Sequence, residues 1–116
     1  MPNELSVNAG ALEIFSLNGN EVAIDFGFNS RAMSDANYTV LDSEYKKSIL
    51  KFTGTLGATR NIVLPTTAGA IFIIDNQTTQ SLVIKTSGGT GPTIATTKKA
   101  IVYCDGTDYV RVTADA

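Results

Sequence analysis

The feature that most constrains the fold is the alternation of residues in EVAIDFGF, residues 21–28. Val22, Ile24, Phe26 and Phe28 fall on one face of an extended chain, and the residues between them fall on the other. A period of two is the pattern of a β-strand that is buried on one side. This segment therefore predicts a sheet with a core on one of its faces.

The other apolar segments are also short, and breaks of Gly, Pro, Asn, Asp and Thr separate them about every ten residues. We predict further strands in LEIFSL, ILKFTG, NIVLP, AIFIID, LVIKT, AIVYC and YVRV. Ile71–Ile74 is apolar at every position, so we expect a central strand there. The pattern predicts an all-β chain, an antiparallel β-sandwich that is jelly-roll-like, with about eight to nine short strands. The best helix candidate is residues 41–48, LDSEYKKS, with Asp42 or Ser43 as its N-cap.

The length of 116 residues suits one domain. We expect residues 1–11 to form an N-terminal arm and residues 12–116 to form a single β-sandwich domain. The formal net charge is −2, which gives no basic footprint for a nucleic acid partner. Acidic residues are concentrated near the N-terminus, where Glu4, Glu13 and Glu21 are candidate contacts to a partner.

Compartment signals are few. The single cysteine excludes an internal disulfide, and residues 1–15 lack the basic and apolar regions of a signal peptide. No apolar stretch approaches the roughly 20 residues of a membrane-spanning helix. We therefore expect synthesis in a reducing cytoplasm and no membrane partner.

The segment YCDGTDYVRV, residues 103–112, raises the question of a catalytic or metal site because Cys104 lies beside Asp105 and Asp108. The chain has no histidine, which removes Cys-His and Ser-His-Asp catalysis and the common zinc sites. Two acids are too few for a calcium loop of the EF-hand type. We therefore expect no enzyme activity, no metal ligands and no cofactor.

A hairpin explains the same segment better. Either Asp105-Gly106 forms a type I′ turn or Gly106-Thr107 forms a type II′ turn. Both registers would bury Ile101, Tyr103, Val110 and Val112 and leave Cys104 on the opposite face. The glycine-rich segment at residues 87–92 lacks the lysine of a phosphate loop and is expected to connect two strands. The turn residues that we expect to be structural are Gly19, Gly54, Pro65, Asn76, Gly91, Asp105 and Gly106.

From Ser34 to Val112 the sequence resembles a small β domain of bacteriophage virion proteins. The resemblance is carried in order by ANYTVLDSEYKKSILKFTG, TGTLGATRNIVLP, IFIIDNQTTQSLVIKTSGGTG and KKAIVYCDGTDYVRV. Within the second piece, Gly54, Leu56, Arg60 and Pro65 stand in the expected order. In such proteins the domain is a building block of tail fibres, tail-associated proteins and capsid decoration, is often trimeric, and has no cofactor.

The resemblance and the short length favour a capsid cement or decoration protein that bridges and stabilises major capsid subunits. We expect a homotrimer on the capsid surface of a virion, with the major capsid protein as its partner. The alternative is a receptor-binding or adhesion module of a short tail or head fibre, with a host surface glycan as its partner.

Overall fold

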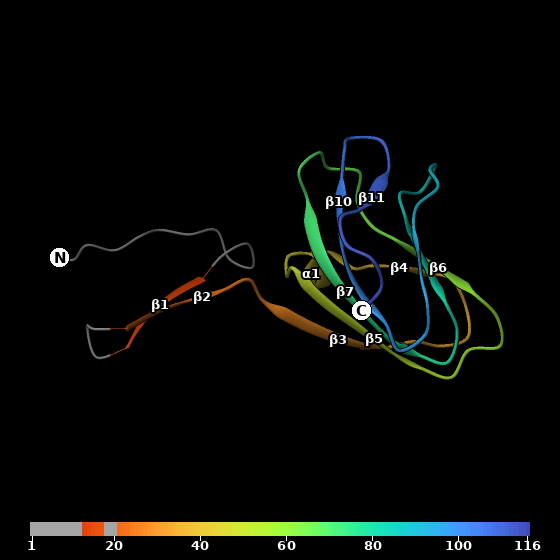
Figure 1. Ribbon diagram of the computed structural model, residues 1–116, viewed down its shortest axis with the longest axis horizontal. Coiled ribbons are helices and arrows are strands. Elements are labelled where there is room, and N and C mark those ends of the chain that lie inside the picture. The colour runs from red at the N-terminus through yellow and green to blue at the C-terminus, as the bar shows by residue number, and fades with distance from the viewer. Residues whose placement is uncertain (1–12, 18–20) are drawn as a thin grey trace.

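The computed structural model describes residues 13–17 and 21–116, with side chains from Phe26 onward (Figure 1). The predicted arm at residues 1–11 and the turn residue Gly19 lie outside the described residues. The described part of the chain contains eleven strands and one short helix. In chain order they are β1 (Glu13–Leu17), β2 (Glu21–Asp25), β3 (Phe28–Ala32), β4 (Tyr38–Thr39), α1 (Asp42–Tyr45), β5 (Ile49–Gly54), β6 (Arg60–Val63), β7 (Ile71–Thr78), β8 (Leu82–Lys85), β9 (Thr93–Ile94), β10 (Lys99–Cys104) and β11 (Tyr109–Arg111).

The chain winds between two mixed sheets (Figure 1). The five-stranded sheet has the order β11-β10-β7-β5-β3, and the four-stranded sheet has the order β4-β6-β8-β9. From β3 to β8 each strand is followed by one in the other sheet, so the neighbours β3, β5 and β7 are parallel, as are β4, β6 and β8. The pairs Phe28–Ile49 and Ile49–Ile73 show that one coil of this winding takes 21 to 24 residues. β9, β10 and β11 then pair antiparallel and complete the two sheets.

The all-β prediction is confirmed, and β7 is the central strand of the five-stranded sheet. The prediction of antiparallel sheets is wrong because four of the strand pairs are parallel, and jelly-roll pairing is not confirmed. Alternation shows that a segment is a strand, but it does not show which strand lies beside it. Parallel neighbours need a connection of a dozen or more residues, and here a strand in the opposite sheet supplies it.

Three boundaries also differ from prediction. The strand expected over residues 21–28 is divided into β2 and β3, and between them Gly27 has a φ of +84°. The described residues form eleven strands instead of the expected eight or nine, and two of these, β4 and β9, are short strands of only two residues each. The helix α1 has Leu41 as its N-cap instead of Asp42 or Ser43, since the Glu44 carboxylate accepts the Leu41 N–H at 3.0 Å.

Both sheets contribute to one hydrophobic core. The five-stranded sheet supplies Leu50, Phe52, Phe72, Ile74, Ala100, Val102, Cys104 and Tyr109, and the four-stranded sheet supplies Ile62, Leu82, Ile84 and Ile94. Burying such side chains stabilises the fold by about 1.5–3 kcal/mol each for the larger aliphatic ones. One core, shared by both sheets, therefore holds the two sheets together.

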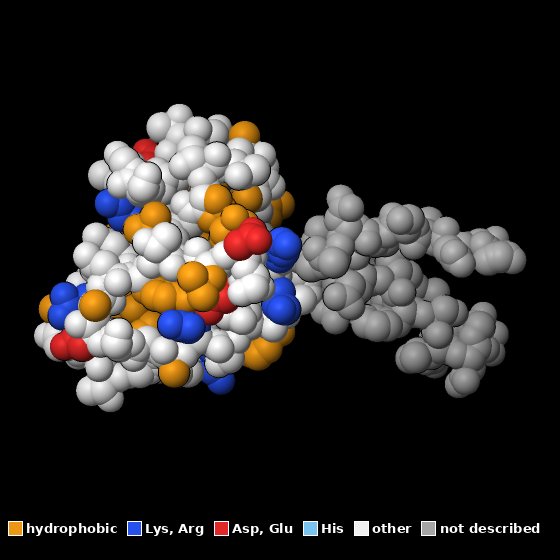
Figure 2. All heavy atoms as spheres, turned by 180° about the vertical axis from the view of Figure 1, so that it is seen from behind, with side chains coloured by type: hydrophobic (Ala, Val, Ile, Leu, Met, Phe, Trp, Pro, Cys, Tyr) orange, Lys and Arg blue, Asp and Glu red, His pale blue; other side chains and the backbone are white. Residues whose placement is uncertain are grey.

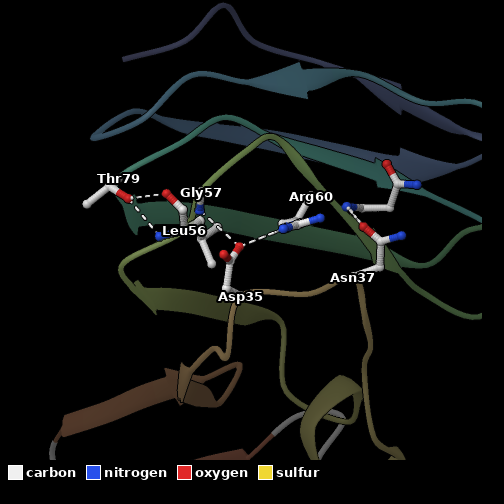
Figure 3. Close-up of polar contacts among 7 residues, drawn as sticks. Asp35, Asn37, Leu56, Gly57, Arg60 and Thr79 are labelled. Atoms are coloured by element: carbon white, nitrogen blue, oxygen red, sulfur yellow. Dashed lines mark hydrogen bonds and ion pairs between the residues drawn. The ribbon is translucent and has the colours of Figure 1, made fainter.

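Polar contacts hold successive coils together where the chain passes from the five-stranded to the four-stranded sheet (Figure 3). Asp35, between β3 and β4, accepts the Gly57 N–H at 2.9 Å and two N–H groups of Arg60 at 2.8 and 3.0 Å. Thr79, after β7, accepts the Leu56 N–H at 2.8 Å and donates to the Leu56 carbonyl at 3.1 Å. Each turn thus satisfies backbone groups of the turn in the neighbouring coil, which fixes the stacking of the coils.

Candidate functional site

The closing hairpin adopts the second of the two predicted registers. Cys104 lies opposite Tyr109, which places Gly106-Thr107 at the centre of the turn. Asp105 donates its N–H to the Asp108 carbonyl at 3.0 Å, and Gly106 has a φ of +103°. The Asp105 carboxylate accepts the N–H groups of Thr107 and Asp108 at 2.9 Å, and these backbone hydrogen bonds lower its pKa. The Asp105 carboxylate therefore caps the turn, whereas the Asp108 carboxylate accepts the Thr90 N–H at 2.9 Å from a neighbouring loop.

The predicted faces of this hairpin are wrong. Cys104 is only 1% exposed and belongs to the core, whereas Tyr103, Val110 and Val112 are exposed and Ile101 is half-buried. Both faces of β10 are apolar in sequence, so alternation alone does not choose between them. The choice is made by packing, because the small Cys104 and Ala100 fit between the sheets.

An apolar band therefore covers part of the outer face of the five-stranded sheet. The band consists of Phe28, Ile49, Ile71, Ile73, Ile101, Tyr103, Val110 and Val112. The register places Phe28 opposite Ile49, and Ile49 opposite Ile73. Ile101 lies opposite Ile73 on the next strand, and Tyr103 lies opposite both Ile71 and Val110. Apolar residues from all five strands are thus neighbours on one surface.

Several members of the band are well exposed. Phe28 is 55% exposed, and Ile71 and Val112 are each 58% exposed. A hollow of about 420 Å³ opens in the band and is lined by Phe26, Ser48, Gly69, Ile71, Ile73 and Ile101. Figure 2 shows hydrophobic side chains interspersed with charged ones on the side of the molecule that faces away from the viewer in Figure 1. Contiguous apolar surface of this kind marks interaction sites more often than single exposed apolar residues do.

A polar row borders the band on the same face of the sheet. Ser30, Lys51, Asp75 and Lys99 are opposite one another in the register of β3, β5, β7 and β10. The Lys99 ammonium lies 3.9 Å from the Asp75 carboxylate, which also accepts a hydrogen bond from Gln77 at 2.7 Å. Within the described part of the chain, Lys51 makes no ion pair. The outer face therefore combines an apolar half with a half that carries more lysine than acid.

A second polar cluster, centred on Glu44, lies where the first coil ends. The Glu44 carboxylate accepts hydrogen bonds from the Tyr38 hydroxyl at 2.5 Å and from the Leu41 N–H at 3.0 Å. The Asn29 amide at 3.4 Å and the Arg31 guanidinium at 3.7 Å also face it. Arg31 in turn lies over the Tyr38 ring, 4.5 Å from its centroid.

Burial acts to raise the pKa of Glu44, but the hydrogen bonds from Tyr38, Leu41 and Asn29 and the charge of Arg31 outweigh it, so the pKa is lowered. Burial and the same hydrogen bond raise the pKa of Tyr38 to about 12. The Tyr38 hydroxyl is therefore held as a neutral donor to a charged Glu44 carboxylate. β3 and β4 are the edge strands of their sheets, so the cluster closes the end of the core as a polar cap.

The remaining predicted turn residues support the fold. Gly54 ends β5 with a φ of +132°, and the Pro65 carbonyl accepts the Tyr109 hydroxyl at 2.7 Å. Gly91 lies between β8 and β9, where a Cβ would come within 1.7 Å of the Ile84 carbonyl oxygen. Asn76 lies inside β7 and is fully buried, with Gln77 and Thr78 between it and the turn that it was expected to form.

Of the predicted partner contacts, Glu13 begins β1 and Glu21 begins β2, while Glu4 lies outside the described residues. The apolar band was not predicted from the sequence. The signal was present in AIFIID and AIVYC, whose apolar residues occupy both faces of their strands. A strand that is apolar on both faces needs a cover on each face.

Residues 13–17 and 21–116 contain no group of three or more His, Cys, Asp or Glu side chains that could hold a metal ion. Within the same residues, no helix has the length and hydrophobicity needed to cross a membrane. Comparisons with protein-family models, with curated proteins and with solved structures found no match to this chain. The apolar band is therefore the candidate functional site on the strength of its own chemistry.

Proposed function

We propose that this chain is a structural virion protein of a bacteriophage, a capsid cement protein that acts as a homotrimer on the capsid surface. It would bridge neighbouring major capsid subunits and stabilise their contacts. The single observation that carries the proposal is the apolar band, which is suited to burial against protein. The order of turn motifs from Ser34 to Val112 supplies the link to virion proteins.

For the architecture, we propose a β-sandwich that is wound as a short solenoid. Support comes from the parallel register within each sheet and from the core to which both sheets contribute. Such a unit suits a cement protein, since the coils rest on local backbone pairing and leave the outer face of one sheet for a partner.

The experiment uses particles of the phage that encodes the chain, prepared without this protein. Added wild-type protein should bind to these particles and raise the temperature at which they release DNA. An Ile71→Lys variant should bind more weakly, because a charge in the band weakens the contact between copies and so removes the multivalent binding of the trimer. A Gln77→Lys variant adds the same charge at an exposed position on the same face of β7, outside the band, and should bind normally. Failure of the wild-type protein to bind would contradict the cement function.

The second candidate is an adhesion module of a short tail or head fibre that binds a host surface glycan. Tyr103 favours it, because this aromatic ring is exposed in the band and aromatic surfaces bind sugars. Tyr109 is buried and Tyr38 is engaged by Glu44, so neither offers a comparable platform. Saturable binding to host cells that is lost in Tyr103→Ala would favour adhesion over cement.

A further inference from the structure

We infer that the apolar band is covered by the β1–β2 hairpin of a second copy of this chain, so that copies join hairpin to band. This inference does not depend on the virion role, because it rests on the charges and the strand pairing of the chain itself. It names both surfaces of the contact between copies.

The hairpin needs a cover. Among the residues that the structure describes, β1 and β2 pair with each other and with no strand of the two larger sheets. A two-stranded hairpin alone is marginally stable at best in water. The register also places Glu13 opposite Asp25, and like charges directly opposite each other destabilise an antiparallel pair. A surface that supplied both positive charge and apolar contact would remove both weaknesses.

The band and its border supply these two properties. Lys51 and Lys99 lie in the polar row beside the band. Residues 1–25 contain four acids, Glu4, Glu13, Glu21 and Asp25, and no Lys or Arg. The hairpin also brings apolar residues on the face that its acids share, since its register places Phe15 opposite Ala23 between the pairs Glu13–Asp25 and Leu17–Glu21. The hollow of about 420 Å³ in the band has room for an apolar side chain.

The connection between hairpin and band favours a second copy over the same copy. After β2, Phe26 accepts a hydrogen bond from the Ser48 N–H and Gly27 accepts one from the Ile49 N–H, which fixes the chain at the edge of the five-stranded sheet. β1 and β2 extend away from the two larger sheets (Figure 1). A contact in which one surface meets a different surface of the next copy is heterologous, and it closes into a ring when the rotation permits.

The test measures the mass of the full-length chain in solution by light scattering after size-exclusion chromatography, over a range of concentrations. The wild-type chain should form a discrete oligomer. Ile71→Lys should weaken association by about 30-fold or more, the effect expected for loss of a central contact. Gln77→Lys is the matched control and should associate like the wild type. Circular dichroism and thermal melting show that each variant is folded.

A charge exchange identifies the hairpin as the occupant. Glu21→Lys with Asp25→Lys should weaken association, and so should Lys51→Glu with Lys99→Glu. A chain that carries all four changes should recover it, because the charges of hairpin and border are then exchanged. Recovery would be specific to a contact between these two surfaces.

Four results would overturn the inference. They are a wild-type chain that stays monomeric at high concentration, equal association of Ile71→Lys and Gln77→Lys, no loss in either charge-reversed pair, and no recovery in the chain with four changes. A wild-type chain that is monomeric in solution would mean that the band is covered by the hairpin of the same copy or by another protein. This test does not use the number of copies in virus particles. The inference and the cement function therefore fail independently of each other.

Discussion

Replacing Asn76 with alanine should cost more stability than any other single polar substitution in β7. Asn76 is fully buried, and its amide nitrogen donates to the carbonyls of Gln80 and Ile94 at 2.9 and 3.0 Å. Its amide oxygen accepts the N–H and the hydroxyl of Thr78 at 3.0 and 2.7 Å. One side chain therefore joins β7, the turn that follows it and β9.

The magnitude follows from these four hydrogen bonds. Each is worth about 1 kcal/mol net, and truncation also leaves buried polar groups without partners. We expect Asn76→Ala to lower the free energy of unfolding by about 3–5 kcal/mol. For 116 residues and an unfolding entropy of about 2 cal/mol/K per residue, a loss of about 4 kcal/mol lowers the melting temperature by about 15 °C.

The assay is urea unfolding followed by circular dichroism, with Gln77→Ala as the control. Gln77 is the next residue on the same strand, but it is exposed and bonds only the Asp75 carboxylate among the contacts described. The control should lose less than about 0.5 kcal/mol. If Asn76→Ala lost no more than the control, the bonds to Gln80 and Ile94 would not be what fixes this turn.

Four further changes have expected outcomes. The folded pKa of Glu44 lies below its ordinary value of 4.5, so its contribution to the free energy of unfolding is present above that pH and is lost as the pH falls through the folded pKa. Glu44→Gln should therefore flatten the acid side of a stability curve measured from about pH 7 to about pH 3. An unchanged curve would contradict this. Gly91→Ala should melt several degrees lower than Gly88→Ala, because a Cβ at Gly91 meets a backbone oxygen whereas a Cβ at Gly88 meets nothing within 4 Å; equal melting temperatures in calorimetry would refute the close approach. Cys104→Ser should cost about 1–3 kcal/mol in urea unfolding, because a hydroxyl replaces a thiol in the core, and a neutral result would show that the site is not apolar. Gly106→Val should cost about 1–3 kcal/mol in thermal melting because of the positive φ, and unchanged melting would remove the turn assignment.

The sequence predicts the strands better than it predicts their partners. The segments AIFIID and LVIKT are recognisable as strands because they are short, apolar and bounded by turn residues. Nothing in them indicates that β7 lies parallel to β5, since that pairing depends on the path of the chain through the other sheet. β3 was missed as a separate strand because FNSRA carries polar residues at the positions that face the Glu44 cluster.

The candidate site was predictable only in part. The turn at Gly106 follows from its residues, and its register was one of two that the residues allow. The face of β10 was assigned wrongly, because Ile101 and Tyr103 are bulky apolar or aromatic side chains and yet lie outside. Side-chain volume between the sheets decides this, and volume is a property of the assembled core. An apolar band can therefore be predicted only when the strand partners are known.

The measurement that tests the cement proposal most directly is the copy number of this chain in purified particles of the bacteriophage that the proposal makes its source. Quantitative mass spectrometry against the major capsid protein gives the ratio. The cement function predicts a fixed ratio to the capsid protein, with copies distributed over the whole shell. A ratio that corresponds to one vertex or to the tail would contradict cement and favour adhesion, and absence from the particle would contradict any role in the virion.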